Sequence, residues 1–298
     1  MFNDSSKRSL ASYSIRFVML ILILAFTQKE TVPFTSLIEV ENKFAKMSVD
    51  QSIVESFCAN LSDSSIVFEN GMPVFGLPHW KSRKPVNKYL FWWPEAADVA
   101  NSGELGYTTG PYEWGSDKST RIAMGGGYYS SVWKKNRMGE WKIAIDLGSG
   151  IYKPGSRTPG PIKVDHPVTE PPGYFIDKPQ LKNILSIDEA YNSILSNENK
   201  SYLKDRLSTE IRLYRMDAPV MITLDSVPNE YGSVPSCNYE FRQSGGEVAV
   251  SGEFAFTYGL VNETKFNNFR DSLMKMNYLR IWKYEKVRGW RIVLDVNG

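Results

Sequence analysis

The feature that most constrains the fold of this chain is a repeated segment. Residues 133–146 read Trp-Lys-Lys-Asn-Arg-Met-Gly-Glu-Trp-Lys-Ile-Ala-Ile-Asp, and residues 282–295 read Trp-Lys-Tyr-Glu-Lys-Val-Arg-Gly-Trp-Arg-Ile-Val-Leu-Asp. Both tryptophans and the final aspartate of the first segment return 149 positions later. A chain of 298 residues is long enough for about two domains. The repeat therefore predicts two copies of one domain.

The repeated segment has the pattern of a β-hairpin. Apolar and polar residues alternate from Trp141 to Asp146, which is the period of a strand with one buried face. The preceding residues 129–134 are rich in aromatic and β-branched types, which favour strands. The polar connection between them contains Gly139, which suits the positive φ of a turn. Each copy is thus expected to end in a hairpin that closes a sheet.

The N-terminal segment resembles a targeting signal. Three basic residues, Lys7, Arg8 and Arg16, precede a short apolar run at residues 17–26. This is the pattern of a secretory signal peptide, and the run is too short to span a bilayer comfortably. An uncleaved membrane anchor and a buried helix are alternatives. We expect residues 1–30 to be a signal peptide or short anchor, and the protein to be exported, with membrane contact only through this segment if it is uncleaved.

Composition sets further limits. The net charge of +2, from 35 basic and 33 acidic residues, provides no strong field, so nucleic acid is not an expected partner. The two cysteines, Cys58 and Cys237, leave open a disulfide between the domains or two buried thiols.

A proline-rich stretch divides the chain. Seven of the sixteen prolines fall between Gly148 and Pro179, which predicts an extended connector without a packed core of its own. We therefore expect a first domain at residues 36–148, a linker at 149–180 and a second domain at 186–298. In each domain, apolar residues at helical spacing come first and strand patterns follow.

Three segments of the first domain resemble a known family. Residues 102–110, Ser-Gly-Glu-Leu-Gly-Tyr-Thr-Thr-Gly, residues 128–133, Tyr-Tyr-Ser-Ser-Val-Trp, and residues 139–146 closely resemble the SnoaL-like group. This group belongs to the nuclear transport factor 2-like superfamily, which also contains ketosteroid isomerase. The resemblance covers about residues 36–148, and 186–297 more loosely. It implies an α+β fold of two tandem cone-shaped rolls, each with N-terminal helices packed on a curved antiparallel sheet.

The resemblance also implies a pocket, because in this fold the sheet wraps around the helices and leaves an apolar cone open at one end. Six of the eight tryptophans lie in the first domain, and apolar walls with a few polar groups suit a small-molecule site. We expect the first domain to hold any ligand, without a cofactor. The expected walls are aromatic: Trp92, Trp93, Tyr107, Tyr112, Trp114 and Trp133.

Catalytic candidates are few. Ketosteroid isomerase uses a carboxylate base with a tyrosine and a protonated carboxylic acid. Asp98, Tyr107, Tyr112 and Asp146 are conceivable counterparts, but none matches the enzyme's motif, so those roles are not carried over. Asp98 is a candidate pocket base or, alternatively, a turn or surface carboxylate. Asp146 and its repeat Asp295 are expected to be structural hydrogen-bond acceptors at strand ends.

His79 is the one histidine inside either predicted domain, and it could act as a general acid or base or lie on the surface. A single histidine cannot form a histidine-rich metal site, and neither Cys-x-x-Cys nor His-Glu-x-x-His spacing occurs, so no metal site is expected.

Three functions remain open, because one fold can host binding modules, enzymes and assembly domains. The first is an exported protein that binds a small apolar or amphipathic molecule in the cone of the first domain without catalysis. The second is a lyase, isomerase or hydrolase, which needs a carboxylate or histidine that points into the same cone. The third is a non-catalytic scaffold, in which the two copies pack as an internal pseudo-dimer or the chain forms a homodimer.

Overall fold

The computed structural model describes residues 33–150, 152–155, 159–164, 181–196, 203–216, 218–228, 237–265 and 272–298. The expected signal peptide or anchor, residues 1–30, lies outside the described residues, and so does most of the expected linker. Within the described ranges, no helix has the length and apolar character needed to cross a membrane.

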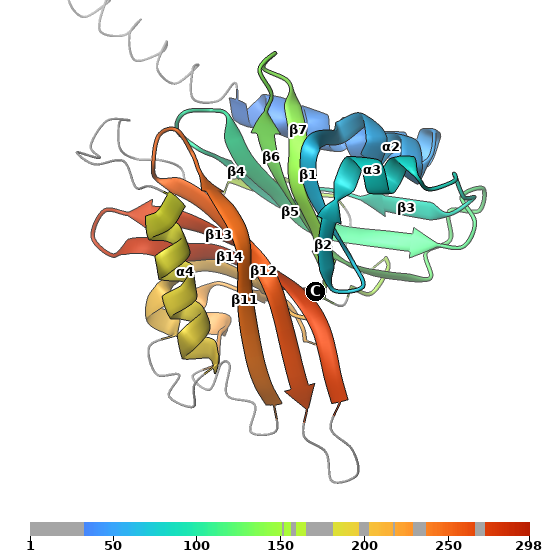
Figure 1. The fold of residues 1–298 in the computed structure, drawn as a ribbon. Coiled ribbons are helices and arrows are strands. Elements are labelled where there is room, and N and C mark those ends of the chain that lie inside the picture. Colours follow the sequence, from blue (N-terminus) through green and yellow to red (C-terminus); the bar gives the residue numbers. More distant parts are fainter. Residues whose placement is uncertain are drawn as a thin grey trace, which may run out of the picture.

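The first half of the chain, up to residue 164, packs three helices on a mixed sheet (Figure 1). The helices are residues 33–50, α2 (Ile53–Asn60) and α3 (Gly76–Lys81). The strands are β1 (Leu61–Glu69), β2 (Met72–Phe75), β3 (Tyr89–Trp92), β4 (Ala96–Val99), β5 (Leu105–Gly115), β6 (Gly125–Lys135), β7 (Trp141–Ser149) and β8 (Lys163–Val164). Their order is β2-β1-β7-β6-β5-β4-β8, and β3 also pairs with β5.

The second half, from residue 181, packs one long helix, α4 (Leu181–Ser196), on a second sheet. Its short 3-10 turns are η1 (Lys204–Arg206) and η2 (Leu224–Ser226). The strands are β9 (Leu207–Tyr214), β10 (Met221–Ile222), β11 (Cys237–Val248), β12 (Phe254–Lys265), β13 (Ser272–Glu285) and β14 (Gly289–Asn297), in the order β10-β9-β14-β13-β12-β11. The predicted α+β fold with helices on each of two sheets is confirmed.

The sheets differ in one respect from the predicted antiparallel arrangement. β1 runs parallel to β7, and β9 runs parallel to β14, whereas the long central strands are antiparallel. The short strand β8 is also parallel to its partner β4. The two hairpins also share a register shift, after Val132 in the first and after Ile281 in the second. Such bulges bend a strand, which helps each sheet to curve.

Part of the predicted linker belongs to the first half. Tyr152 is buried against Trp93 and Tyr128, with ring centroids 6.0 and 5.8 Å away. β8 extends the first sheet by pairing with β4. Residues 152 and 163–164 of the predicted linker therefore pack on the first half, which proline content alone does not reveal.

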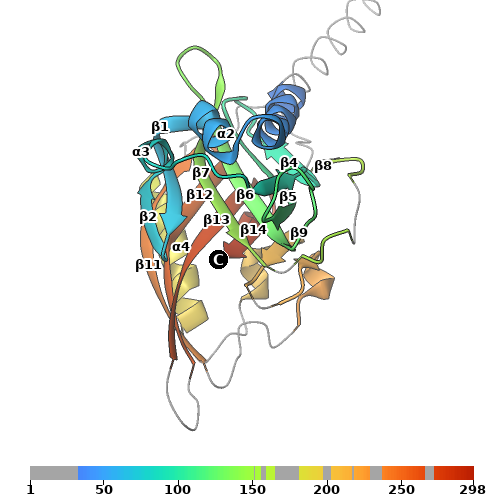
Figure 2. The ribbon, with the colours of Figure 1, turned by 90° about the vertical axis from the view of Figure 1, so that its right-hand side faces the viewer.

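The two sheets pack face to face, with helices on the outer sides (Figures 1 and 2). One apolar cluster contains buried residues of both halves. Its members include, from the first half, Trp93, Leu105, Tyr107, Tyr128, Ile145 and Leu147, and from the second half, Tyr214, Phe254, Phe256, Leu279, Ile281 and Val296. Tyr128 stacks on Tyr214 at a centroid distance of 4.9 Å. Each sheet therefore has one face towards its own helices and one towards the other sheet.

Contacts between the halves are reciprocal. The backbone N–H of Asn101 donates to Glu253 Oε1 at 2.7 Å, and that of Val250 donates to Glu104 Oε1 at 2.7 Å. Val250 and Glu253 lie 149 positions after Asn101 and Glu104. Reciprocal pairs of this kind are the mark of an interface with two-fold symmetry. The halves thus contact each other as the two subunits of a symmetric dimer do.

Candidate functional site

Two adjoining cavities border the first half: the inner one lies between its helices and its sheet, and the outer one also has walls from the second half. The inner cavity has a volume of about 160 Å³, and the outer one about 390 Å³. Phe57, Asp146 and Gly148 line both, so the two spaces meet along β7 and α2. The inner cavity is lined by Phe44, Phe57, Leu90, Trp92, Tyr112, Tyr129, Asp146 and Gly148, of which five are aromatic.

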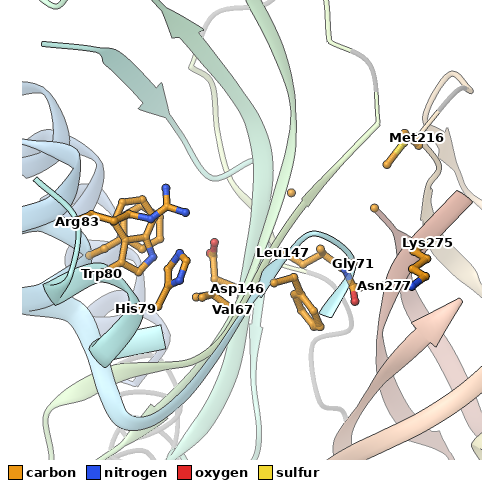
Figure 3. A pocket seen from close by; sticks show the side chains of 14 residues that line it. Val67, Gly71, His79, Trp80, Arg83, Asp146, Leu147, Met216, Lys275 and Asn277 are labelled. Carbon is orange, nitrogen blue, oxygen red and sulfur yellow. The ribbon is translucent and has the colours of Figure 1, made fainter. Parts of the chain in front are cut away.

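The outer cavity is more polar (Figure 3). His79 and Trp80 of α3 and Arg83 just after it lie on one side of the cavity, and Lys275 and Asn277 of β13 lie on the other. Trp80 stacks on Phe57 at a centroid distance of 4.1 Å, and the guanidinium of Arg83 lies 5.0 Å above the Trp80 ring. The aromatic stack therefore separates the charged outer cavity from the apolar inner one.

A buried carboxyl, Glu41, lies behind the inner cavity on the first helix. Trp92 Nε1 donates to its Oε1 at 2.6 Å, Trp133 Nε1 donates to its Oε2 at 2.9 Å, and Thr108 Oγ1 donates to Oε2 as well. Burial raises the pKa of Glu41 to about 7, and the charge of Asp146 adds to this rise, although the hydrogen bonds oppose it. Glu41 is therefore close to half-ionised at neutral pH.

Asp146 of β7 is the carboxyl that borders both cavities. Ser131 Oγ donates to its Oδ2 at 2.6 Å. Burial raises the pKa of Asp146 to about 6, although the hydrogen bond from Ser131 opposes the rise. Among the described residues neither Glu41 nor Asp146 forms an ion pair. The cone of the first half therefore holds two acidic groups that gain charge between about pH 5 and pH 8.

The raised pKa of Glu41 predicts a loss of stability as the pH rises. The folded protein holds this proton more tightly than the unfolded chain, whose glutamates titrate near 4.5. The stabilising contribution is complete below that value and is lost as the pH rises through about 7. We expect the free energy of unfolding in urea to fall by about 3 kcal/mol over this window through Glu41 alone. Glu41→Gln should flatten the profile, whereas Glu39→Gln, an exposed position on the same helix, should not. Parallel profiles for the wild type and Glu41→Gln would contradict the assignment.

The structure brings three of the predicted wall residues to the cone. Trp92 and Tyr112 line the inner cavity. Trp133 is fully buried beside it and donates to Glu41 and, at 3.1 Å, to Thr108 Oγ1.

The other three predicted wall residues lie elsewhere. Trp93 and Tyr107 belong to the cluster between the two sheets, where Tyr107 packs against Phe254 at 6.2 Å between centroids. The indole of Trp114 is 45% exposed, outside both cavities. Adjacent strand residues point to opposite faces, so Trp92 and Trp93 cannot both face the cone, and aromatic type alone does not tell which one does.

The two catalytic candidates have different outcomes. Asp98 is buried, pairs with Lys283 Nζ at 2.5 Å and lines neither of these two cavities. His79 borders the outer cavity, where its Nδ1 lies 3.2 Å from Glu69 Oε2. No group of three His, Cys, Asp or Glu side chains in the described ranges is placed to hold a metal ion.

Glu41 was missed, and Asp146 was expected to be only structural. The signal for Glu41 was its spacing, because it lies on the same helical face as Leu37, Phe44 and Ala45, which are all buried. A carboxylate on an apolar stripe is costly unless it is hydrogen-bonded.

No family model matches the chain, and no curated protein does. Solved structures do match. A ketosteroid isomerase-like protein from Erwinia carotovora atroseptica is 15% identical with a TM-score of 0.36, and the match covers 41% of this chain and 96% of that one. A putative dehydratase of the NTF2-like family from Streptomyces avermitilis is 11% identical with a TM-score of 0.34, covering 39% and 93%. The CaMKII hub of S. rosetta is 10% identical with a TM-score of 0.35, covering 41% and 98%. Each of these matches covers about two fifths of this chain and more than nine tenths of the other protein.

Proposed function

We propose that the first half binds a small molecule in its inner cavity and that the outer cavity is the way in. The observation that carries this proposal is a cavity of about 160 Å³ with five aromatic residues in its walls and one carboxyl, Asp146, at its border. Ligand sites combine apolar walls with a few polar groups in this way. A cavity of about 150 Å³ is large enough for a molecule the size of benzene.

A side chain that fills the inner cavity should weaken ligand binding. Gly148 lines both cavities, and a Cβ placed there would lie 3.3 Å from Cε1 of Tyr112, so the branches of a leucine would project into the space. We expect Gly148→Leu to weaken binding at least about tenfold, the loss that corresponds to about 1.4 kcal/mol. Trp114→Leu, which changes an exposed ring outside the cavity, should bind as the wild type does.

The measurement is ligand-observed NMR with benzene-sized neutral, cationic and anionic compounds, with circular dichroism to establish that each variant is folded. The proposal fails if no compound binds the wild type, or if a folded Gly148→Leu variant binds as well as the wild type.

A second candidate function is acid–base catalysis in the same space. The observation that favours it is the pKa of about 6 for Asp146, since a carboxyl that titrates near neutrality and borders a cavity can accept and return a proton. This function requires turnover of a bound compound. Product formation that is lost in Asp146→Asn, while binding persists, would favour it over binding alone.

Three sequence predictions complete the proposal. We propose that the protein is exported, on the basis of residues 1–30, and N-terminal sequencing of the mature protein would test this. We also propose the domain limits 36–148 and 186–298 and an internal pseudo-dimer. The reciprocal contacts of Asn101 and Val250 support the pseudo-dimer, because the face that a second copy would cover is already occupied. A dimeric mass in solution would contradict that part.

A further inference from the structure

The two halves carry different residues at one position in the middle of the sheet. In the first half, Thr108, Ser131 and Asp146 lie side by side across β5, β6 and β7. In the second half, the corresponding register places Thr257, Arg280 and Asp295 side by side across β12, β13 and β14. Each residue of the second set lies 149 positions after its counterpart. An arginine therefore stands in the second cone where the first has a serine.

The guanidinium of Arg280 lies between α4 and the sheet of the second half. It is fully buried, and its Nη1 donates to Asp188 Oδ1 and to Asn192 Oδ1, each at 2.7 Å. Its Nε lies 3.4 Å from Asp295 Oδ1. Three rings surround the same group, with centroids 4.2 Å away for Tyr278, 4.7 Å for Tyr191 and 5.4 Å for Phe241. This arrangement, two carboxylates within an aromatic cage, is a binding site for a cation.

The first half has the same cage without the arginine. Trp92 pairs with Tyr112 as Phe241 pairs with Val261, and Tyr129 pairs with Gly148 as Tyr278 pairs with Asn297. Phe44 follows Glu41 by three residues on its helix, as Tyr191 follows Asp188. All three counterparts, Phe44, Trp92 and Tyr129, line the inner cavity together with Asp146.

The buried carboxyls of the first half lack the cationic partner that Arg280 provides in the second half. Asp188 and Asp295 both pair with Arg280, whereas Glu41 and Asp146 pair with no cation in the described part of the chain. Glu41 does not border the cavity, so its charge would act from behind the wall, and Asp146 would make the direct contact.

Other charged groups face Asp146 across the outer cavity. They are His79 of α3, Arg83 just after α3, and Lys275 of β13. His79 Nδ1 and Arg83 Nη2 both contact Glu69, at 3.2 and 3.1 Å, so Arg83 forms an ion pair with this carboxylate and not with Asp146. The inner cavity has no basic residue among its lining side chains.

We propose that the ligand of the inner cavity is an organic cation, whose amidinium, guanidinium or alkylammonium group takes the place that the Arg280 guanidinium has in the second half. This inference rests on the proposed binding function and names its ligand class. The charged group would lie among Phe44, Trp92 and Tyr129 and donate to Asp146. The remainder of a larger ligand would extend past Gly148 into the outer cavity, which has a volume of about 390 Å³.

The test compares three compounds of nearly the same shape on the full chain: benzamidine, which is a cation at neutral pH, benzamide, which is neutral, and benzoate. We expect benzamidine to bind at least tenfold more tightly than benzamide, and benzoate more weakly still. Benzamidine affinity should rise from pH 5 to pH 8 as the carboxyls ionise, whereas benzamide affinity should stay level. Equal or tighter binding of benzamide or benzoate in the cavity would overturn the cation proposal and leave the binding function standing. If none of the three compounds binds, and no compound of the wider set binds either, both the cation proposal and the binding function are overturned.

Ser131→Arg supplies a cation from the chain itself and should abolish benzamidine binding. Because the new side chain has to fit, Asp146→Asn provides an independent variant of nearly unchanged shape. We expect Asp146→Asn to remove the preference for benzamidine over benzamide and its dependence on pH, with benzamide binding retained. A folded Asp146→Asn variant that keeps the tenfold preference would contradict the proposed contact.

Discussion

Replacing Arg280 by serine should lower the free energy of unfolding by about 3–5 kcal/mol, the usual cost of removing one partner from a buried ion pair. Asp188 and Asp295 are both fully buried, and Arg280 is the cation that pairs with each of them. Without it, Asp188 loses its cation, Asp295 keeps only its pair with Arg215 at 2.7 Å, and an empty volume is left among the rings that enclosed the guanidinium. Urea unfolding at pH 7.5 measures the loss.

Two measurements distinguish the loss of the ion pairs of Arg280 from a general loss of packing. Arg242→Ser changes an exposed arginine on β11 of the same sheet and should alter the free energy of unfolding by less than about 0.5 kcal/mol. Methylguanidinium at low millimolar concentration should raise the melting temperature of Arg280→Ser, because a ligand that binds only the folded state stabilises it. It should leave Arg242→Ser unchanged. A variant that loses stability but shows no such recovery would mean that the cone collapses when its arginine is removed.

Asp98→Ala also costs about 3–5 kcal/mol, because it leaves Lys283 buried between the two sheets without this carboxylate. The side chains of Lys283 and Asp98 are only 6% and 5% exposed. The pair has a reciprocal counterpart 149 positions away, Lys134 with Glu247, at the same distance of 2.5 Å but 46% and 36% exposed. Glu247→Ala is therefore the matched control and should cost less than about 1 kcal/mol, as exposed ion pairs do.

A double-mutant cycle tests the origin of the effect. Asp98→Ala combined with Lys283→Met should cost less than Asp98→Ala alone, because the second change removes the stranded charge. If the two single losses add, the ion pair is not the cause. Similar losses for Asp98→Ala and Glu247→Ala would show that burial does not distinguish the two reciprocal pairs.

The repeat carried enough information to predict the fold. Trp133 to Asp146 and its copy 149 residues later define a hairpin, and a hairpin that recurs at that distance implies two sheets of similar design. The parallel pairs β1–β7 and β9–β14 were not predictable from alternation, because the period of a strand is the same in either direction.

The site was harder to predict, because its residues are defined by which face of a strand they occupy. Trp92 and Trp93 differ by one position, and one borders the cavity while the other packs against the second sheet. Asp98 has its partner 185 positions away, in the other half. The exchange of Ser131 for Arg280 is visible at the repeat offset, but only the structure reveals that this position points into the cone.

The reciprocal contact between the halves has a consequence for how such a site can arise. When two identical chains form a symmetric dimer, any substitution that fills the cavity of one subunit fills the cavity of the other subunit as well. When both units are joined in one polypeptide, each can change separately. One unit can then hold a buried side chain in its cavity and serve as a rigid support, while the other keeps its cavity open. Titration with a true ligand should accordingly reach saturation at a single equivalent per chain.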